Sequence, residues 1–537
     1  MRPHLMHPTE DFRIGSEPDE HATAVVADLG LGAVLDAMSG GDPFFLGVAT
    51  AAVLSGLDDP GAIAYRQDVL RDCMADPGSV RVLYDLAVAA LEVQRKVWRP
   101  YARSPESVLR WGVESLGMLM ESLRELRRFA TDHAGELSSA GFRRFFAVVG
   151  EELDDAYLDE VTAHLDRLGF RQGMLLGADL GPTNRGAHHT VRVPAGSRLT
   201  IGQRLGLGAR RGLSFTIAER DEAGIRALGQ LKDRGVAGLA DAVSRSVDHV
   251  VGFFECLRTE LAFHLGCCSL AARLDRSVPR CFPTVVSADQ SYLSGRTLCD
   301  PGLALRLDGP VVGNDLQADG RALVVVTGAN QGGKSTWLRS VGIAQLLAQA
   351  GMFVTAESWT TSVRRGVFTH FAREEDTAMV GGKLDEELLR MSGIVDLLAP
   401  GSMVLSNESF ASTNEREGSE IARQVFTALA ASGVTVLAVT HLFELADGLN
   451  RQDDPTVLFL RAVREEDGRR PFRLVEAEPL PTSYGRELFE REFGVRPDGA
   501  PTLGGLGAAP EKLADRPACP DARQAGSARR RDLRGTP

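Results

Sequence analysis

The chain has 537 residues, a formal net charge of −12, 25% charged residues and 44% hydrophobic residues. This length predicts three or four domains, and the composition is ordinary for a folded protein. The negative charge excludes a surface that is basic all over, but it is compatible with a local basic patch for nucleic acid.

The cysteines and the N-terminus indicate the compartment. Seven cysteines are scattered along the chain without any Cys-x-x-Cys pair. No signal-peptide core is visible at the N-terminus, and no run of about 18 apolar residues occurs. We therefore expect reduced thiols and a cytoplasmic protein that does not associate with membranes. The adjacent Cys267 and Cys268 are expected to serve helix packing, with a metal site as the less favoured alternative.

The N-terminal half is predicted to be mostly helical. Residues 1–28 are polar and mixed, and we expect a variable, loosely ordered lead-in. Residues 29–180 show apolar residues at spacings of three and four, which is typical of amphipathic helices that form a helical core. One such stripe consists of Leu109, Val113, Leu116, Met120 and Leu123.

Residues 181–225 have a different composition, rich in Gly, Pro and Thr. Short alternating runs at Thr190–Val193 and Leu213–Ile217 predict a small β-rich insertion. Between Arg171 and Ser214 there are seven arginines and a single acid, Asp179. This basic stretch is either a solvated loop face or a tip that contacts the phosphates of a nucleic acid, and the residues leave both readings open.

Residues 226–275 are predicted to form one long lever helix. An apolar seam steps by three or four residues from Val236 to Leu265. A helix of roughly 30 residues is about 45 Å long and can connect a remote tip to another domain. Phe253-Phe254-Glu255 lies within this helix, and we expect it to serve packing and not base stacking.

Residues 276–498 are predicted to form an α/β nucleotide-binding domain, followed by a disordered tail over 499–537. A strand, a Gly-rich loop and a helix follow one another around Val324–Thr336, and the spacing Gly328-x4-Gly333-Lys334-Ser335 is that of a phosphate-binding loop. Glycines let backbone N–H groups converge on a polyphosphate, and the next helix presents its positive N-terminus. Lys334 is predicted to contact the β- and γ-phosphates, and Ser335 to ligate Mg²⁺. The predicted nucleotide-binding residues are Gly328, Ala329, Asn330, Gln331, Gly332, Gly333, Lys334, Ser335 and Thr336.

Two further strands supply candidate catalytic residues. The run Met403–Ser406 ends in Asn407-Glu408, where Asp-Glu is usual. Asn407 can accept a hydrogen bond from a Mg²⁺-bound water but brings no charge, and Glu408 is the candidate general base or water-positioning group. The run Val434–Val439 leads to His441, which either senses the γ-phosphate or caps the following helix.

Two loops carry small or polar residues, Gly381-Gly382-Lys383 and Ser412-Thr413-Asn414. They can present backbone N–H groups to a phosphate across a homodimer, which would make the ATP site composite. The alternative is two solvated loops.

These motifs together resemble a known family, the MutS-type DNA mismatch repair ATPases. Thr327–Thr336 reads TGANQGGKST and is similar to the family's TGPNMGGKST, and Thr440–Leu445 (THLFEL) is similar to its THxxEL switch. Asn314-Asp315 and Ser483-Tyr484-Gly485 resemble two further motifs, so the resemblance covers about 40–495. It implies an α/β P-loop (ABC-type) ATPase domain preceded by an all-α lever and core domain with a small, clamp-like β-rich insertion. It also implies ATP, Mg²⁺ and DNA as ligands, and a dimer.

The sequence departs from the family at several points. The chain begins near the family's lever region, so we expect the mismatch-reading domains to be missing. Asn407 stands where the family has Asp, no Ser occurs around Gly381-Gly382-Lys383, and Val311 and Val312 stand near the place of the family's adenine-stacking aromatic. We expect a DNA-binding ATPase of repair or recombination with slow hydrolysis. The alternatives are a nucleotide-gated scaffold with little or no hydrolysis and no mismatch specificity, and a metabolic kinase, which the long lever disfavours.

Overall fold

The computed structural model describes residues 1–15, 19–97, 104–170, 173–181, 186–192, 215–307, 309–373, 382–465 and 469–480. Met1–Thr482 form one compact unit, and the second unit, Ser483–Pro537, lies outside the described residues. The SYG motif and the predicted tail therefore belong to the part of the chain that is not described.

The N-terminal part of the first unit is a set of helices, and most of them begin at an N-cap residue that the sequence shows. Among the helices described up to α10, all but α2 begin with an Asp or Ser side chain that accepts a hydrogen bond from the first turn. The helices α3 to α6 also have Pro in the first turn, where its missing N–H costs nothing. The helices are α1 (Glu20–Leu29), α2 (Gly32–Ser39), α3 (Pro43–Ser55), α4 (Pro60–Ala75), α5 (Pro77–Lys96), α6 (Pro105–His133), α7 (Ala140–Glu152), α8 (Asp155–Leu168) and α10 (Glu222–Arg273).

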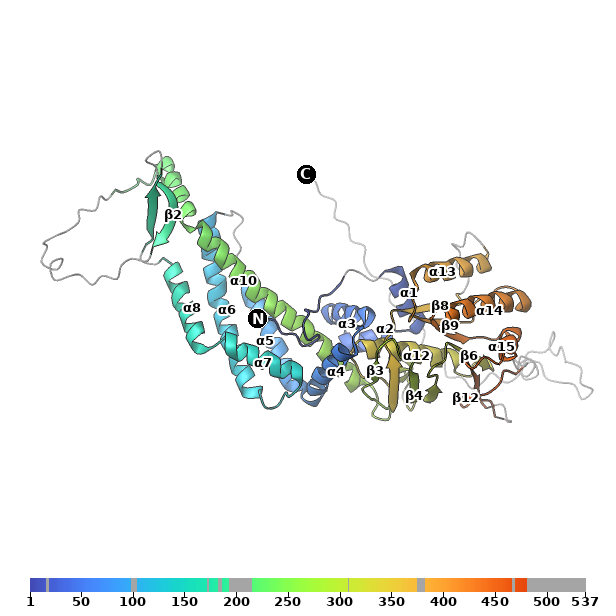
Figure 1. Cartoon of the computed structure of the whole chain (residues 1–537). Helices are drawn as coiled ribbons and strands as arrows, with labels where there is room; N and C mark the ends of the chain where they lie inside the picture. The colour runs from blue at the N-terminus through green and yellow to red at the C-terminus, as the bar shows by residue number, and fades with distance from the viewer. Residues whose placement is uncertain are drawn as a thin grey trace, which may run out of the picture. The chain divides into compact units, whose positions relative to one another are not determined.

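The predicted long helix exists as α10 and has 52 residues, beginning at Glu222 and ending at Arg273, close to the expected bounds of 226 and 275. It packs along α5 and α6, as Figure 1 shows. A Cβ built on Gly112 of α6 would lie 2.6 Å from Val243 Cγ1, so the two helices approach closely there. Phe253 and Phe254 are buried at 1% and 0% exposure, which confirms that they serve packing.

The β-rich insertion is present in part. The strands β1 (Leu175–Leu180) and β2 (Gly186–Arg192) form an antiparallel hairpin that contacts α10. The first strand lies before the expected boundary at 181. The sequence pattern did not predict it, because apolar and polar residues do not alternate along this strand. Phe215–Ile217 are not a strand, so that prediction is wrong for the described part of the run. Of the seven arginines in the basic stretch, Arg192 is the one that falls within the described residues.

The N-terminal segment is packed, so the expectation of a loosely ordered lead-in is wrong for residues 1–15. Leu5 and Met6 are completely buried. The buried carboxylate of Glu260 on α10 accepts a hydrogen bond from the Leu5 N–H at 2.6 Å, and the buried guanidinium of Arg66 donates to the Met6 carbonyl at 2.7 Å. The backbone of this segment thus forms hydrogen bonds with two buried ionisable side chains. No periodic pattern in the sequence predicts these contacts.

The C-terminal part contains a six-stranded sheet in the order β12-β11-β6-β10-β9-β8. All neighbours pair in parallel except β11 and β12. The strands are β6 (Leu323–Gly328), β8 (Val367–Phe371), β9 (Met403–Asn407), β10 (Thr435–Val439), β11 (Val457–Ala462) and β12 (Leu474–Glu476). The helices of this part are α11 (Pro301–Ala304), α12 (Lys334–Gln349), α13 (Lys383–Leu397), α14 (Glu415–Ala431) and α15 (Phe443–Asn450).

A second sheet has four strands in the order β3-β7-β4-β5. They are β3 (Thr284–Val286), β7 (Ser358–Ser362), β4 (Leu293–Leu298) and β5 (Asn314–Gln317). The two faces of β6 pack in different hydrophobic cores. Val324 and Val326 pack in the core shared with the N-terminal helices. Leu323 and Val325 pack in the core that lies against α14 and α15. No single described helix is long and apolar enough to cross a bilayer, and the one pair that reaches this length together, α1 with α2, is bent by 91°.

The buried carboxyl of Glu260 makes the stability of the helical part depend on pH. Burial raises the pKa of Glu260 from 4.5 to about 7, although the Leu5 and Cys256 hydrogen bonds oppose the shift. A raised folded-state pKa contributes stability that is complete below 4.5 and is lost as pH rises through about 7. We expect Glu260→Gln to become more stable than the wild type over this window, by on the order of 3 kcal/mol above pH 7.

Thermal unfolding between pH 5 and 8 measures this difference, with the exposed Glu255→Gln on the same helix as control. Parallel pH profiles for the wild type and Glu260→Gln would contradict the prediction.

Candidate nucleotide-binding site

The predicted phosphate loop connects the end of β6 to the start of α12. Gly328 has a φ of +111°, and a Cβ there would lie 2.9 Å from the Ala462 backbone nitrogen, so the position requires glycine. Gly333 precedes α12 with a φ of +87° and provides no side-chain cap. The first N–H groups of α12 therefore point into the loop without a side-chain partner, which is the arrangement of an anion site.

Lys334 is held inside the loop. Its side chain is buried, and its Nζ donates to the carbonyls of Gly328 at 2.8 Å and Ala329 at 3.2 Å. Burial lowers the pKa of Lys334, the nearby Glu408 opposes this, and Arg470 adds to it. A polyphosphate would offer this ammonium charged acceptors, which form stronger hydrogen bonds than the two neutral carbonyls.

The two residues predicted to contact the metal ion lie together. The Ser335 hydroxyl on α12 donates to the Asn407 side-chain oxygen at the end of β9, at 2.9 Å. A hydroxyl and a carbonyl-type oxygen are hard ligands of the kind that Mg²⁺ prefers. The residues therefore fit Mg²⁺ or its bound waters, although the amide contributes no charge.

The two predicted catalytic residues are also brought together. Glu408 follows β9 with a φ of +58°, which is uncommon for a residue other than glycine. Its carboxylate accepts a hydrogen bond from the His441 N–H at 3.2 Å and contacts the His441 imidazole Nδ1. This hydrogen bond is the main reason why the pKa of His441 is raised above its ordinary value, while burial opposes the shift.

The structure excludes one of the two roles considered for His441, and γ-phosphate sensing stays a prediction. The helix α15 begins after Leu442 without a side-chain cap, so the helix-capping alternative is wrong. The imidazole instead faces Glu408, next to the phosphate loop.

A buried hydrogen-bond network lies directly behind the end of β9. His370 on β8 contacts the Ser409 hydroxyl at 2.6 Å through Nδ1 and the Glu387 carbonyl at 3.0 Å through Nε2. Ser409 also contacts Ser406 at 2.6 Å. Burial lowers the pKa of His370 to about 4, so the ring is neutral at physiological pH. This network stabilises the chain next to Glu408, whose backbone has an uncommon positive φ.

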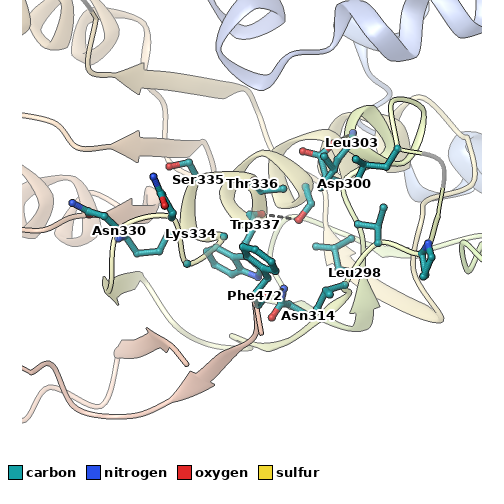
Figure 2. A pocket seen from close by; sticks show the side chains of 18 of the residues that line it. Leu298, Asp300, Leu303, Asn314, Asn330, Lys334, Ser335, Thr336, Trp337 and Phe472 are labelled. Atoms are coloured by element: carbon teal, nitrogen blue, oxygen red, sulfur yellow. Dashed lines mark hydrogen bonds between the residues drawn. The ribbon is translucent and has the colours of Figure 1, made fainter. Parts of the chain in front are cut away.

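A cavity of about 630 Å³ lies beside the phosphate loop, and Figure 2 shows residues that line it. The phosphate loop, Trp337 and Glu408 form one part of its wall. The other part includes Phe472, which follows β11 and was not among the predicted site residues. No motif marks this residue, because it is an isolated aromatic in a loop. The remaining apolar lining residues are Leu298, Leu303, Leu307, Pro310, Val311 and Val312.

The described residues of the two additional candidate loops do not line this cavity. Gly381 lies outside the described residues, and Gly382 precedes α13 without a side-chain cap. Asn414 caps α14 by accepting a hydrogen bond from the Glu417 N–H at 3.0 Å. None of the described residues of either loop lines the cavity. A contribution from these loops across a dimer stays a prediction.

The contact between Glu408 and His441 gives a direct spectroscopic prediction. In Glu408→Gln the charged acceptor is lost, so the pKa of His441 should fall to about 6.5 or below. An NMR titration of the imidazole measures this, with His441→Asn to assign the signal. The exposed Glu420→Gln on α14 is the control and should leave the titration unchanged. An unaltered pKa in Glu408→Gln would show that the two side chains are not paired in solution.

The comparisons with known proteins agree with this arrangement. A family model for the MutS2 N-terminal domain matches residues 58–277, and a model for MutS domain V matches residues 324–491. The first match spans the helices from α4 to α10, and the second begins in β6 and includes the phosphate loop, Asn407, Glu408 and His441.

Several curated proteins are similar to parts of the chain. A "DNA mismatch repair protein MutS 2" of Halobacterium salinarum is 34% identical over 35% of this chain, and an "Endonuclease MutS2" of Lactiplantibacillus plantarum is 32% identical over 40%. A "DNA mismatch repair protein MutS" of Thermus aquaticus is 37% identical over 33%. The matches span between 22% and 27% of the lengths of these relatives. With two consecutive domain models matched and these relatives aligned, the chain belongs to the MutS family.

Proposed function

We propose that this chain binds ATP with Mg²⁺ in the cavity beside the phosphate loop, hydrolyses it slowly, and uses the nucleotide state to control contact with DNA in repair or recombination. The observation that carries this proposal is that the Gly-rich loop, the start of α12 and Glu408 line one cavity. Two further predicted residues contact members of this lining: Asn407 accepts a hydrogen bond from Ser335, and His441 donates one to Glu408.

Each residue has a defined task in this proposal. The backbone N–H groups of the loop and the Lys334 ammonium bind the β- and γ-phosphates. Ser335 and Asn407 hold Mg²⁺ or its waters; when bound there, the ion would neutralise charge on the phosphate oxygens. The Glu408 carboxylate orients the attacking water, and His441 controls whether that carboxylate is free to do so, because it holds the same oxygen atom.

Asn407 predicts weak metal binding, and its replacement tests this directly. Asn407→Asp keeps an acceptor for the Ser335 hydroxyl and adds one negative charge beside a dication. We expect the Mg²⁺ concentration for half-maximal nucleotide binding to fall by roughly tenfold. Asn407→Ala is the matched control, which removes the acceptor without adding charge and should raise that concentration. Equal Mg²⁺ dependence for all three proteins would exclude Asn407 from the metal site.

Three observations support DNA as the partner: the positive charge of the stretch after Arg171, the packing of its hairpin on α10, and the names of the relatives. Two relatives are named as DNA mismatch repair proteins and one as an endonuclease. The basic stretch after Arg171 stands out in an acidic chain, and the hairpin within it packs on α10. We infer that the partner is DNA, bound through its backbone and without mismatch specificity, and that the active form is a homodimer with composite ATP sites.

A second function, a nucleotide-gated scaffold with little or no hydrolysis, is favoured by one observation. The metal-facing residue at the end of β9 is an uncharged amide. In that case ATP would bind and change the protein without measurable turnover.

An ATP turnover assay with and without duplex, branched and mismatched DNA at low salt distinguishes these functions. The first function predicts slow turnover that DNA stimulates and that Lys334→Ala abolishes, with Lys96→Ala, at the exposed end of α5 and outside the cavity, as control. Binding of ATP without turnover in any condition would support the scaffold. DNA-independent turnover together with no DNA binding would refute the DNA part of the proposal.

A further inference from the structure

The turn after β9 holds Glu408 in a backbone conformation that few side chains adopt. Glu408 has a φ of +58° and Phe410 has a φ of +62°, so two residues other than glycine have positive φ within three positions. Such a conformation costs energy and persists only where the surroundings fix it. The Glu408 N–H donates to the Val439 carbonyl of β10 at 2.9 Å, which fixes the turn on one side. The other side needs a contact of its own.

The Ser409 side chain supplies that contact. It is 4% exposed, and its hydroxyl oxygen lies 2.6 Å from His370 Nδ1 and 2.6 Å from the Ser406 hydroxyl. It also lies 2.8 Å from the His370 carbonyl. His370 on β8 and Ser406 on β9 are direct neighbours in the sheet. The hydroxyl next to Glu408 is therefore bound to two strands.

The direction of these hydrogen bonds follows from the other ring nitrogen of His370. Nε2 lies 3.0 Å from the Glu387 carbonyl on α13, a helix that packs on β8 (Figure 1). A carbonyl only accepts, so Nε2 carries the proton of the neutral ring and Nδ1 is the acceptor. Ser409 then donates to Nδ1, and Ser406 donates to the Ser409 oxygen. His370 thus determines where the Ser409 hydroxyl points.

The neighbouring helices enclose the turn at Phe410. Phe410 is completely buried, and its ring stacks on the His370 ring with 5.5 Å between the ring centres. A Cβ built on Gly418 of α14 would lie 2.3 Å from the Phe410 carbonyl oxygen, so the helix backbone lies directly against the turn. The Glu408 side chain, in contrast, lines the cavity. A loss of the Ser409 contact would therefore be relieved on the open side, by a movement of Glu408.

We propose that His370 is a positioning residue for the Glu408 carboxylate and acts through the Ser409 hydroxyl. This inference rests on the proposed function and deepens it, because it names the contacts that aim the group that would orient the attacking water. Without them the turn would relax and the carboxylate would leave His441. The phosphate loop does not use these contacts, so the change would affect turnover and not ATP affinity.

Two substitutions of His370 separate its two contacts. In His370→Asn the amide oxygen can take the place of Nδ1 and accept from Ser409. In His370→Gln the amide nitrogen can take the place of Nε2 and keep the Glu387 carbonyl, while the contact with Ser409 is lost. Ser409→Ala removes the same contact from the other side. The matched control is Ser419→Ala on α14, where a buried serine has a hydroxyl without a hydrogen-bond partner.

An NMR titration of the His441 imidazole in the full chain is the first readout. His370→Gln and Ser409→Ala should lower the pKa of His441, as Glu408→Gln does, because the carboxylate no longer faces the ring. His370→Asn and the control should leave it unchanged. ATP turnover and ATP affinity are the second readout. Turnover should fall about tenfold or more in His370→Gln and Ser409→Ala, while the Kd for ATP changes by less than about twofold.

The outcomes separate this inference from the function on which it rests. An unchanged pKa of His441 in Ser409→Ala, which removes a single oxygen atom, would overturn the positioning role even if a His370 variant does not fold. Equal losses in His370→Asn and His370→Gln would show that the ring only fills space, and would overturn it as well. If the wild type binds ATP without turnover, the proposed hydrolysis fails, and the His441 titration still decides the positioning role.

Discussion

The parallel register of three strands is the constraint on which the site depends. Val439 of β10 pairs with Val326 of β6 on one side and with Asn407 of β9 on the other. The carboxyl ends of these strands therefore lie at the same edge of the sheet, where ligands bind in open α/β folds. A slip of one residue would turn the Asn407 side chain to the other face and separate it from Ser335. The Ser335–Asn407 and Glu408–His441 contacts both follow from this register.

The helix that begins at the phosphate loop connects this edge to the N-terminal helices. The helix α12 contacts α1 and α3, and Arg339 donates to the Asp28 carbonyl at 2.9 Å. A Cβ on Gly342 would lie 2.5 Å from Leu405 and 2.9 Å from Leu29, so α12 is packed without free space between β9 and α1. Close packing transmits small shifts. Under the proposed function, a nucleotide-driven movement of the helical part would pass through this contact.

The sequence predicts the parts of this protein that obey local rules. The glycine spacing, the apolar strands and the 3–4 periodicity of α10 each follow from backbone geometry, and the structure contains all of them. The prediction that residues 1–15 are loosely ordered was wrong, because the side chains that hydrogen-bond to the backbone of Leu5 and Met6 lie on α4 and α10. Phe472 was missed for a similar reason: its position depends on Asn314, 158 residues away. Such contacts between distant residues leave no periodic signal in a single sequence.

A structure of the full chain with Mg²⁺ and a non-hydrolysable ATP analogue would show directly whether the nucleotide binds at the phosphate loop. We expect the triphosphate within Gly328–Thr336, the metal ion beside Ser335 and Asn407, and the Lys334 ammonium moved from its loop carbonyls to the phosphates. A nucleotide bound elsewhere, with Lys334 still on the Gly328 and Ala329 carbonyls, would contradict it.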